Sequence, residues 1–285
     1  MQPAPSIVVF CDLDDTLFEP HAFAGDASTH GALSRIEHAH APLVFSSSKT
    51  RAEIELIQQE IGINQPFICE NGAALFVPRG YFGFRVEQAR HAAGYEVVEF
   101  GKPYAEVVAS LHGAACRLDM KIVGFSDMSV EDVAIDCDLS MLQARLAKLR
   151  EYNEHFRVVD DKRGALPRLF KALRAADLTC TRRGAYYHVG AIHREHAGRF
   201  LGGLYRRAFG QVVTVAFADH RGATPLLRSA EMSLVVASSA PDEMTYLLTH
   251  VPRARLTVAD SVGAWAEVIL EIAGAAQRDR SACSS

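Results

Sequence analysis

The sequence lacks the features that mark membrane and secreted proteins. No window reaches about 18 uncharged apolar residues, the length that a membrane-spanning helix requires. The first residues contain no basic region followed by an apolar segment, so we expect no signal peptide. We therefore expect a protein that has no membrane partner.

Strong positive charge and closely paired cysteines are missing as well. The formal net charge is -4 at pH 7, which argues against a nucleic-acid binder, because such a protein needs a basic face to displace counterions. The six cysteines are scattered without C-x-x-C spacing, as is typical of buried thiols in a reducing compartment. We therefore expect a cytoplasmic protein that binds no nucleic acid. The sequence carries no signal for an oligomeric state.

The chain is long enough to build real hydrophobic cores. It has 285 residues, of which 49% are hydrophobic and 22% are charged. These values are typical of a globular protein with one large domain or two moderate ones. No internal repeat is present.

The segment Ser6–Phe18, SIVVFCDLDDTLF, has the pattern of a buried strand that ends in a cluster of carboxylates. Asp12 and Asp14 are two residues apart, so on an extended backbone both side chains leave the same side of the chain. Two like charges held close together are costly unless a cation lies between them or one is protonated. This arrangement suits a magnesium-assisted carboxylate nucleophile with an acid/base partner, although most D-x-D pairs are solvated turns.

The second predicted core strand ends in the sequence SSSKT. A hydroxyl at this point can donate a hydrogen bond to an anionic oxygen of a substrate, and Ser47 is our candidate. Lys49 can add a charge-assisted contact to the substrate. The alternative is that Ser48 or Thr50 caps the next helix, with Glu53 completing a capping box to Thr50.

Residues Tyr95–Gly190 alternate strand and helix and interrupt the core between its third strand and a later helix. We therefore predict an α/β fold with a doubly wound, mainly parallel core sheet and an inserted α/β cap. The predicted core covers residues 1–92 and 191–285, and the predicted cap covers 93–190. A cap that closes over the core excludes water and confines the substrate, which favours a small anionic molecule.

A third acidic residue follows a later core strand. The predicted strand Val212–Ala218 ends in Asp219, as the first strand ends in Asp12. If the two strands are parallel neighbours, their carboxyl ends meet in one crevice. Asp219 would then complete the Mg²⁺ site.

The string DLDDTLF resembles motif I of the haloacid dehalogenase superfamily of phosphatases. Four further strings, SSKTRAEIE, PFICENGAALFVP, GFSDMSVEDVA and LREYNEHF, occur in the order found in the mannosyl-3-phosphoglycerate phosphatase family, which the chain resembles from about residue 6 to about residue 192. The resemblance implies a phosphatase that hydrolyses the phosphate of a glycosylated 3-phosphoglycerate.

The resemblance also implies roles for individual residues. Asp12 would attack phosphorus, and Asp14 would protonate the leaving oxygen and later deprotonate water. Magnesium would bridge Asp12, the Asp14 carbonyl and the phosphate. The substrate contacts that we expect are made by Lys49, Asn71, Gly72, Glu151 and Glu154. The alternative for the two glutamates is a solvated helix face.

Two motifs depart from the family pattern. Arg194 stands where the family has a lysine that pairs with the nucleophile and the phosphate, and we expect it to take over that role. Gly222 and Ala223 stand where the family has an Asn-Asp pair that supports the metal. The alternative to an active enzyme is a catalytically degenerate relative that binds a phosphorylated ligand as a sensor or partner protein.

Histidines are frequent near these altered motifs. Imidazoles beside Asp12 and Asp219 would favour a softer divalent ion than magnesium, whereas the ordinary alternative is a set of surface histidines. The residues concerned are His188, His193, His196 and His220.

Overall fold

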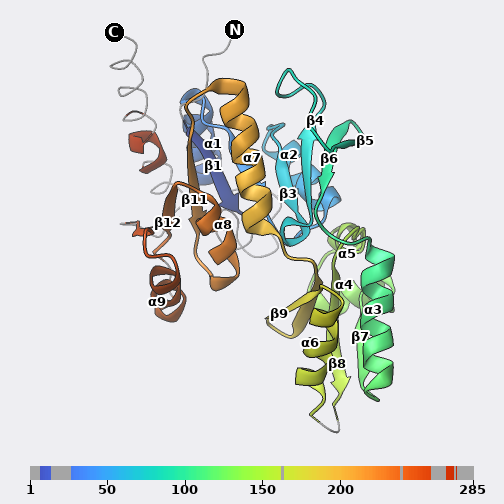
Figure 1. Ribbon diagram of the computed structural model, residues 1–285. Helices are drawn as coiled ribbons and strands as arrows, with labels where there is room; N and C mark the ends of the chain where they lie inside the picture. The colour runs from blue at the N-terminus through green and yellow to red at the C-terminus, as the bar shows by residue number, and fades with distance from the viewer. Residues whose placement is uncertain are drawn as a thin grey trace.

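The computed structural model describes residues 7–13, 27–161, 164–237, 240–257, 268–272 and 274. These residues form two sheets, each with its own helices (Figure 1). The larger sheet lies in the upper half of Figure 1 and the smaller one in the lower half. This is the predicted α/β fold, with a mainly parallel core sheet and a separate antiparallel sheet.

The larger sheet has nine described strands, and β1 lies near its centre. Strands β13, β12, β11, β1, β2 and β3 run parallel to one another, and the sheet continues beyond β3 with the antiparallel strands β4, β6 and β5. In sheet order the strands are β13 (Arg255–Leu256), β12 (Met232–Val235), β11 (Val213–Ala218), β1 (Ile7–Asp12), β2 (Leu43–Ser46), β3 (Phe67–Cys69), β4 (Ala74–Pro78), β6 (Tyr95–Glu99) and β5 (Arg90–Ala92).

Helices cover both faces of this sheet, which explains why every residue of β1 is buried. One face packs against α1 (Ala27–His38), α2 (Arg51–Glu60) and the helical residues 268–272. The other face packs against α7 (Arg194–Phe209), α8 (Thr224–Ser229) and α9 (Pro241–His250). Alternate residues of β1 enter the two cores, as the period of a strand requires.

Helix α2 begins as the sequence predicts. The Thr50 side chain accepts from the Glu53 N–H, and the Glu53 side chain accepts from the Thr50 N–H, which is the expected capping box.

The antiparallel edge corrects one expectation from the sequence. We expected Tyr95–Phe100 to belong to the inserted module, but β6 pairs along its length with β4 in the larger sheet. Val97 and Val98 enter the cores on the two faces of this sheet, and the Tyr95 ring packs edge-on against Phe76 at 5.6 Å. Antiparallel pairing depends on a partner strand as well as on local pattern. We therefore propose that the inserted module begins at about Gly101 and ends at Gly190.

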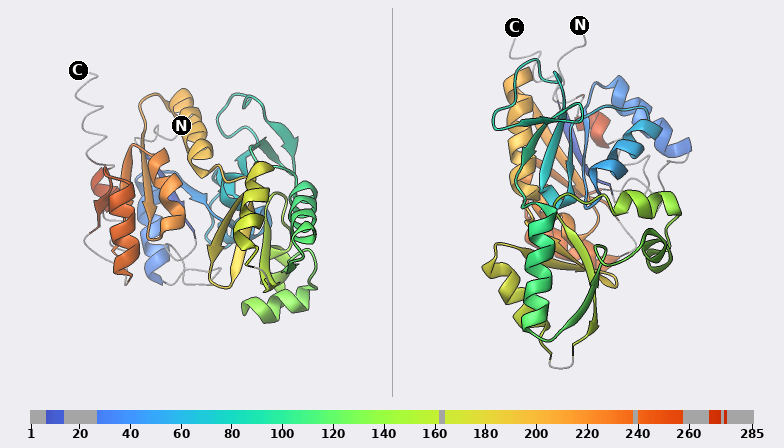
Figure 2. Two further views of the ribbon diagram at one scale, coloured as in Figure 1. Left: turned by 60° about the horizontal axis from the view of Figure 1, so that its bottom comes forward. Right: turned by 90° about the vertical axis from the view of Figure 1, so that its right-hand side faces the viewer.

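The smaller sheet has the strand order β7-β8-β10-β9 and is antiparallel. Helices α3 and α6 pack on it in one core, while α4 and α5 belong to a second, smaller core (Figure 2). Its elements are α3 (Tyr104–Arg117), β7 (Lys121–Gly124), α4 (Val130–Cys137), α5 (Met141–Ala147), β8 (Glu154–Asp160), α6 (Leu166–Ala175), β9 (Thr179–Arg183) and β10 (Tyr186–Gly190).

Within the described ranges, every helix falls short of the length and apolar character needed to cross a bilayer.

Candidate active site

The carboxyl ends of β11, β1 and β2 place three predicted site residues at one edge of the core sheet. Strand β1 lies between the other two and is parallel to both, with Cys11 opposite Phe217 and Asp12 opposite Ser46. Asp12 ends β1, Ser47 follows β2, and Asp219 follows β11. The crevice beyond the carboxyl ends of parallel strands is where ligands bind in open α/β sheets.

Asp12 is paired with Arg194 at this edge. Arg194 is the first residue of α7, and its Nη1 donates to Asp12 Oδ2 at 2.5 Å. The Arg194 Nη2 donates to Asn71 Oδ1 at 3.0 Å. The Asp12 and Arg194 side chains are 0% and 3% exposed, so this ion pair is shielded from water. The structure therefore brings the altered third motif directly to the predicted nucleophile.

His220 connects the two described carboxylates of the site. Its Nδ1 lies 3.1 Å from Asp219 Oδ1, and its Nε2 lies 3.8 Å from Asp12 Oδ2. Burial alone would lower the pKa of the imidazole, but the hydrogen bond to Asp219 and the charge of Asp12 outweigh it, so the pKa is raised. Burial and the charges of Asp12 and Asp219 also raise the pKa of the Cys11 thiol. Asp12 and Asp219 thus act on one small volume.

Ser47 and Lys49 lie in the loop after β2. The Ser47 hydroxyl oxygen accepts from the Lys49 backbone N–H at 3.0 Å, and the Ser47 N–H donates to the Ile68 carbonyl at 3.0 Å. The Lys49 Nζ lies 4.0 Å from a carboxylate oxygen of Glu53. This loop is held by main-chain bonds at the edge where Asp12 lies.

The turn Glu70–Gly72, which follows β3, has an unusual backbone. Its three residues have φ values of 46°, 62° and 87°, all in the left-handed region. At Gly72, a Cβ atom would lie 2.2 Å from the Arg194 backbone nitrogen, so only glycine fits against the start of α7. Asn71 holds the Arg194 side chain, as described above. Both predicted substrate residues of this turn are therefore packed against Arg194.

The side chains of Glu151 and Glu154 accept hydrogen bonds from other residues of the protein. Glu151 Oε1 accepts from Arg51 Nε of α2 at 3.0 Å. Glu154 is 0% exposed and accepts from the Tyr104 hydroxyl and from the Ser126 N–H. Burial raises the pKa of the Glu154 carboxyl. Their substrate-binding roles stay predictions.

The donor set suits a hard cation such as magnesium in part. Two carboxylates, Asp12 and Asp219, converge, and carboxylate oxygen is the ligand type that magnesium prefers. Asp14 lies outside the described residues. Within the described ranges, no group of three or more acidic, histidine or cysteine side chains is arranged to hold a metal. Gly222 and Ala223 lie in the short helix η2 (Arg221–Ala223) and supply no side-chain oxygen.

The four histidines near the altered motifs have different surroundings. His220 lies beside the two carboxylates, whereas His188 stacks on His155 in the smaller sheet with ring centroids 3.8 Å apart. His196 packs edge-on against Phe100 at 5.0 Å. Burial lowers the pKa of His193, the residue before α7. The structure thus places one imidazole, that of His220, between the predicted metal-binding carboxylates.

Two buried charged residues near the site were not singled out from the sequence. The Glu70 carboxylate is 0% exposed and accepts hydrogen bonds from the backbone N–H groups of Glu151, Tyr152 and Asn153. The Arg150 Nη2 donates to the Ser48 carbonyl at 2.8 Å. These partners lie 81 to 102 residues away in the chain, so no local sequence pattern could predict the contacts.

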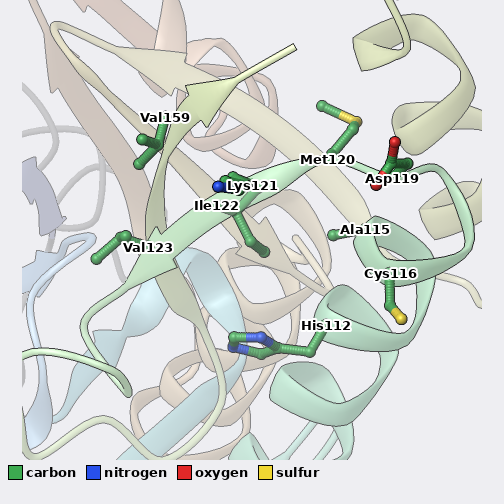
Figure 3. Close-up of a pocket in the computed structure, with 9 residues that line it drawn as sticks. All are labelled: His112, Ala115, Cys116, Asp119, Met120, Lys121, Ile122, Val123 and Val159. Atoms are coloured by element: carbon green, nitrogen blue, oxygen red, sulfur yellow. The ribbon is translucent and has the colours of Figure 1, made fainter. Parts of the chain in front are cut away.

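A separate pocket lies on the inserted module, between α3 and the strands β7 and β8 (Figure 3). It has a volume of about 510 Å³. Its lining includes His112, Met120, Lys121 and Val159, and it contains none of the predicted site residues.

Three comparisons with known proteins bear on this site. The family of haloacid dehalogenase-like hydrolases matches residues 9–81. A glucosyl-3-phosphoglycerate/mannosyl-3-phosphoglycerate phosphatase from Methanococcoides burtonii is 33% identical over 273 residues, which cover 94% of this chain and 97% of the relative. A mannosyl-3-phosphoglycerate phosphatase from Pyrococcus horikoshii is 27% identical over 235 residues, which cover 81% of this chain and 90% of the relative.

Solved structures share the fold at lower identity. A phosphatase of the same superfamily from Bacteroides thetaiotaomicron matches with a TM-score of 0.62 and 14% identity, covering 96% of this chain and 98% of that one. A subclass IIB sugar phosphatase matches with a TM-score of 0.58 and 13% identity, covering 93% of this chain and 98% of that one. At this identity the likeness concerns the fold.

Proposed function

The chain belongs to the mannosyl-3-phosphoglycerate phosphatase family of haloacid dehalogenase-like hydrolases and is a phosphatase. From this premise, we propose that it hydrolyses the phosphate ester of a small glycosylated 3-phosphoglycerate, with a mannosyl or glucosyl group, in a magnesium-dependent reaction through an aspartyl-phosphate on Asp12.

The observation that carries this proposal is the contact between Arg194 and Asp12. A buried carboxylate nucleophile needs a fixed positive charge that can also bind the phosphate, and the Arg194 guanidinium donates directly to Asp12. The guanidinium has donors on more than one nitrogen, so it can contact Asp12 and a phosphoryl oxygen together. This supports the expectation that Arg194 does the work of the family's lysine.

In the proposed reaction, an Asp12 carboxylate oxygen attacks phosphorus in line with the ester oxygen. The bond from phosphorus to the ester oxygen breaks, and Asp14 gives its proton to the leaving alkoxide. Asp14 then takes a proton from water, whose oxygen attacks the aspartyl-phosphate and releases inorganic phosphate. Ser47 would donate a hydrogen bond to a phosphoryl oxygen, and Arg194 would keep the phosphate and Asp12 together.

Asp12, Asp14 and Asp219 are the residues that we propose to hold Mg²⁺. When bound, the ion would supply positive charge that offsets the repulsion between the carboxylate and the phosphate. Because Gly222 and Ala223 add no oxygen ligand, water would complete the metal shell. His220 is the feature that would favour a softer ion in its place.

We propose that the inserted module confines the substrate. Arg183 lies at the end of β9 in this module, and its positive charge would suit an anionic substrate. Lys49, Asn71 and Gly72 would contact the substrate from the core. Glu151 and Glu154 would act from the module.

We propose that the protein works in the cytoplasm. The described cysteines are all free thiols, which suits a reducing compartment.

The test is phosphate release from mannosyl-3-phosphoglycerate and glucosyl-3-phosphoglycerate with magnesium, manganese or cobalt. Asp12→Asn is the blank, and Asp242→Asn, in the first turn of α9, is the matched control. We expect turnover by the wild type and the control and none by Asp12→Asn. Equal rates for wild type and Asp12→Asn would refute the mechanism. Ligand binding by the wild type without turnover would instead identify a non-catalytic binder.

A further inference from the structure

The turn Glu70–Gly72 is held in a conformation that its sequence alone does not favour. Glu70 and Asn71 are not glycine, yet both have positive φ values, 46° and 62°. Such residues persist only where the surrounding structure fixes them. The contacts of this turn therefore show what holds it.

The Glu70 side chain is bonded to the inserted module. Its carboxylate accepts from the N–H groups of Glu151, Tyr152 and Asn153 at 2.8, 3.1 and 2.7 Å. The Arg150 guanidinium lies 3.7 Å away and is also buried. Successive N–H groups that point at one anion form a concave binding site, and here the anion is a side chain of the core.

The segment Arg150–Asn153 is also bonded to the main chain of the two loops beside the site. Asn153 Nδ2 donates to the Glu70 carbonyl at 2.6 Å, and Arg150 donates to the Ser48 carbonyl at 2.8 Å. Ser48 follows Ser47, the predicted phosphate-binding hydroxyl. The segment thus contacts both loops that flank the site.

The other side of the same turn is bonded to Arg194. The Asn71 side chain accepts from Arg194 Nη2 at 3.0 Å, and the Asn71 carbonyl accepts from the His193 N–H at 3.1 Å. The Asn71 N–H donates to the Ser47 carbonyl at 2.9 Å. Arg194 in turn contacts Asp12 at 2.5 Å. The turn Glu70–Gly72 therefore contacts the module on one side and Arg194, the partner of Asp12, on the other.

We propose that Glu70 is a positioning residue, which seats the segment Arg150–Asn153 on the core and thereby fixes the Asn71 turn that aims Arg194 at Asp12. The proposal rests on the proposed phosphatase reaction for its effect on rate. The Glu70 side chain is fully buried against the backbone of residues 151–153. It acts through Asn71 and Arg194.

The neutral substitution Glu70→Gln tests this role. Its amide group keeps the size of the side chain and one accepting oxygen, but it removes the charge and places an N–H donor where the second carboxylate oxygen accepted a backbone N–H. The attachment of Arg150–Asn153 to Glu70 is therefore weakened. The matched control is Glu96→Gln, because Glu96 is also buried, at 4% exposure, and its carboxylate accepts the backbone N–H of Val86 at 3.0 Å. If Glu70→Gln does not fold, Glu70→Asp serves in its place, since it keeps the charge and withdraws it by one methylene.

The first measurement is hydrogen exchange of the amides of residues 151–153, which needs no activity. We expect protection in the wild type and in Glu96→Gln, and faster exchange in Glu70→Gln. Unprotected amides in the wild type, or the same loss in Glu96→Gln, would overturn the proposal. This measurement is informative even if the wild type releases no phosphate. The contact between Glu70 and residues 151–153 is therefore tested separately from the proposed function.

The second measurement is a double-mutant cycle on phosphate release. We expect Glu70→Gln to lower kcat about tenfold or more with a smaller change in KM, since the Arg194–Asp12 contact serves the reaction step. In an Arg194→Ala background the same substitution should have little further effect, because the residue through which it acts is gone. Additive losses, or wild-type kcat in Glu70→Gln, would overturn the positioning role.

Discussion

Arg194 Nη1 and Asp12 Oδ2 are 2.5 Å apart, although the two residues are separated by 182 positions in the chain. Both side chains are almost fully buried. Removing one partner of a buried ion pair destabilises the protein, because the other charge stays buried without a partner. The pair therefore links the chemistry of the site to the attachment of α7.

We predict that Arg194→Ala lowers kcat/KM about a hundredfold or more, because a lost charge-assisted contact in a site with little water costs about 2 to 4 kcal/mol. Arg194→Lys keeps the charge and should retain much more activity. The measurement is phosphate release at several magnesium concentrations. Arg199→Ala is the control, since Arg199 is an exposed residue of the same helix that pairs with Glu195. Wild-type activity in Arg194→Ala would contradict the role of this residue.

We predict that chelation with EDTA abolishes phosphate release and that added magnesium restores it. Gly222→Asn should lower the magnesium concentration needed for half-maximal activity, because it supplies an oxygen next to the predicted site. The new side chain must displace the His220 ring, which lies 3.0 Å from the position of its Cβ. A higher rate with manganese or cobalt than with magnesium would contradict the predicted preference for magnesium.

We predict that a substitution at Ala223, the other altered position of this motif, affects the stability of the fold. Ala223 is 0% exposed and belongs to the apolar core on the α7 face of the sheet. A carboxylate there is buried without a designed partner, so Ala223→Asp should destabilise the fold by at least about 1 to 3 kcal/mol. Thermal melts of the single variants Gly222→Asn and Ala223→Asp separate the two effects. Equal stability for both would show that the core at Ala223 tolerates a charge.

We predict a strong preference for small anionic esters over phosphopeptides. A module that must close over the core accepts only a substrate that fits beneath it. Rates on glycosyl 3-phosphoglycerates should exceed those on phosphopeptides by at least about tenfold, which corresponds to about 1.4 kcal/mol. Comparable rates on both classes would argue against confinement by the module.

We predict that His155 makes the fold sensitive to acid. The pKa of His155 lies well below its usual value. Burial is the largest cause, followed by the positive charges of Arg150, His188, Arg183 and Lys49. Below about pH 6.5 the unfolded chain binds a proton at this residue that the folded chain does not, so the free energy of unfolding falls as the pH falls.

The variant His155→Phe removes this titration and keeps a ring to stack on His188. Its loss of stability between pH 7 and pH 5.5 should be smaller than that of the wild type by about 1 kcal/mol. Denaturant unfolding at each pH measures this difference. His91→Phe, at an exposed position of β5, is the control and should follow the wild type. Parallel pH curves for the wild type and His155→Phe would refute the prediction.

Much of the site was predictable because it follows from strand order. Asp12 and Asp219 each end an apolar strand, and parallel neighbours bring such residues together whatever the rest of the chain does. Arg194 was predictable only through the resemblance, since nothing near it in the sequence indicates a partner 182 positions away. The catalytic role of Asp14 stays a prediction.

Other features depended on contacts that no local pattern contains. Strand β6 was expected in the module, but its place was decided by pairing with β4. Glu70 follows β3, and its partners are a run of backbone N–H groups more than 80 residues away. Almost every residue has a backbone N–H group, so the sequence does not indicate which of these groups will bind a carboxylate. The contact of Glu70 could therefore be found only from the folded structure.

The two segments that connect the core to the module lie close together at the edge of the core. The N–H groups of Phe100 and Gly101 donate to the Ala73 carbonyl, and the His193 N–H donates to the Asn71 carbonyl, only two residues away in the chain. Ends that lie so near each other can be joined by a short linker without changing the order of the core strands. An ancestral core could therefore have gained, lost or exchanged its module in a single insertion or excision, and selectivity could change by grafting while the catalytic sheet was kept.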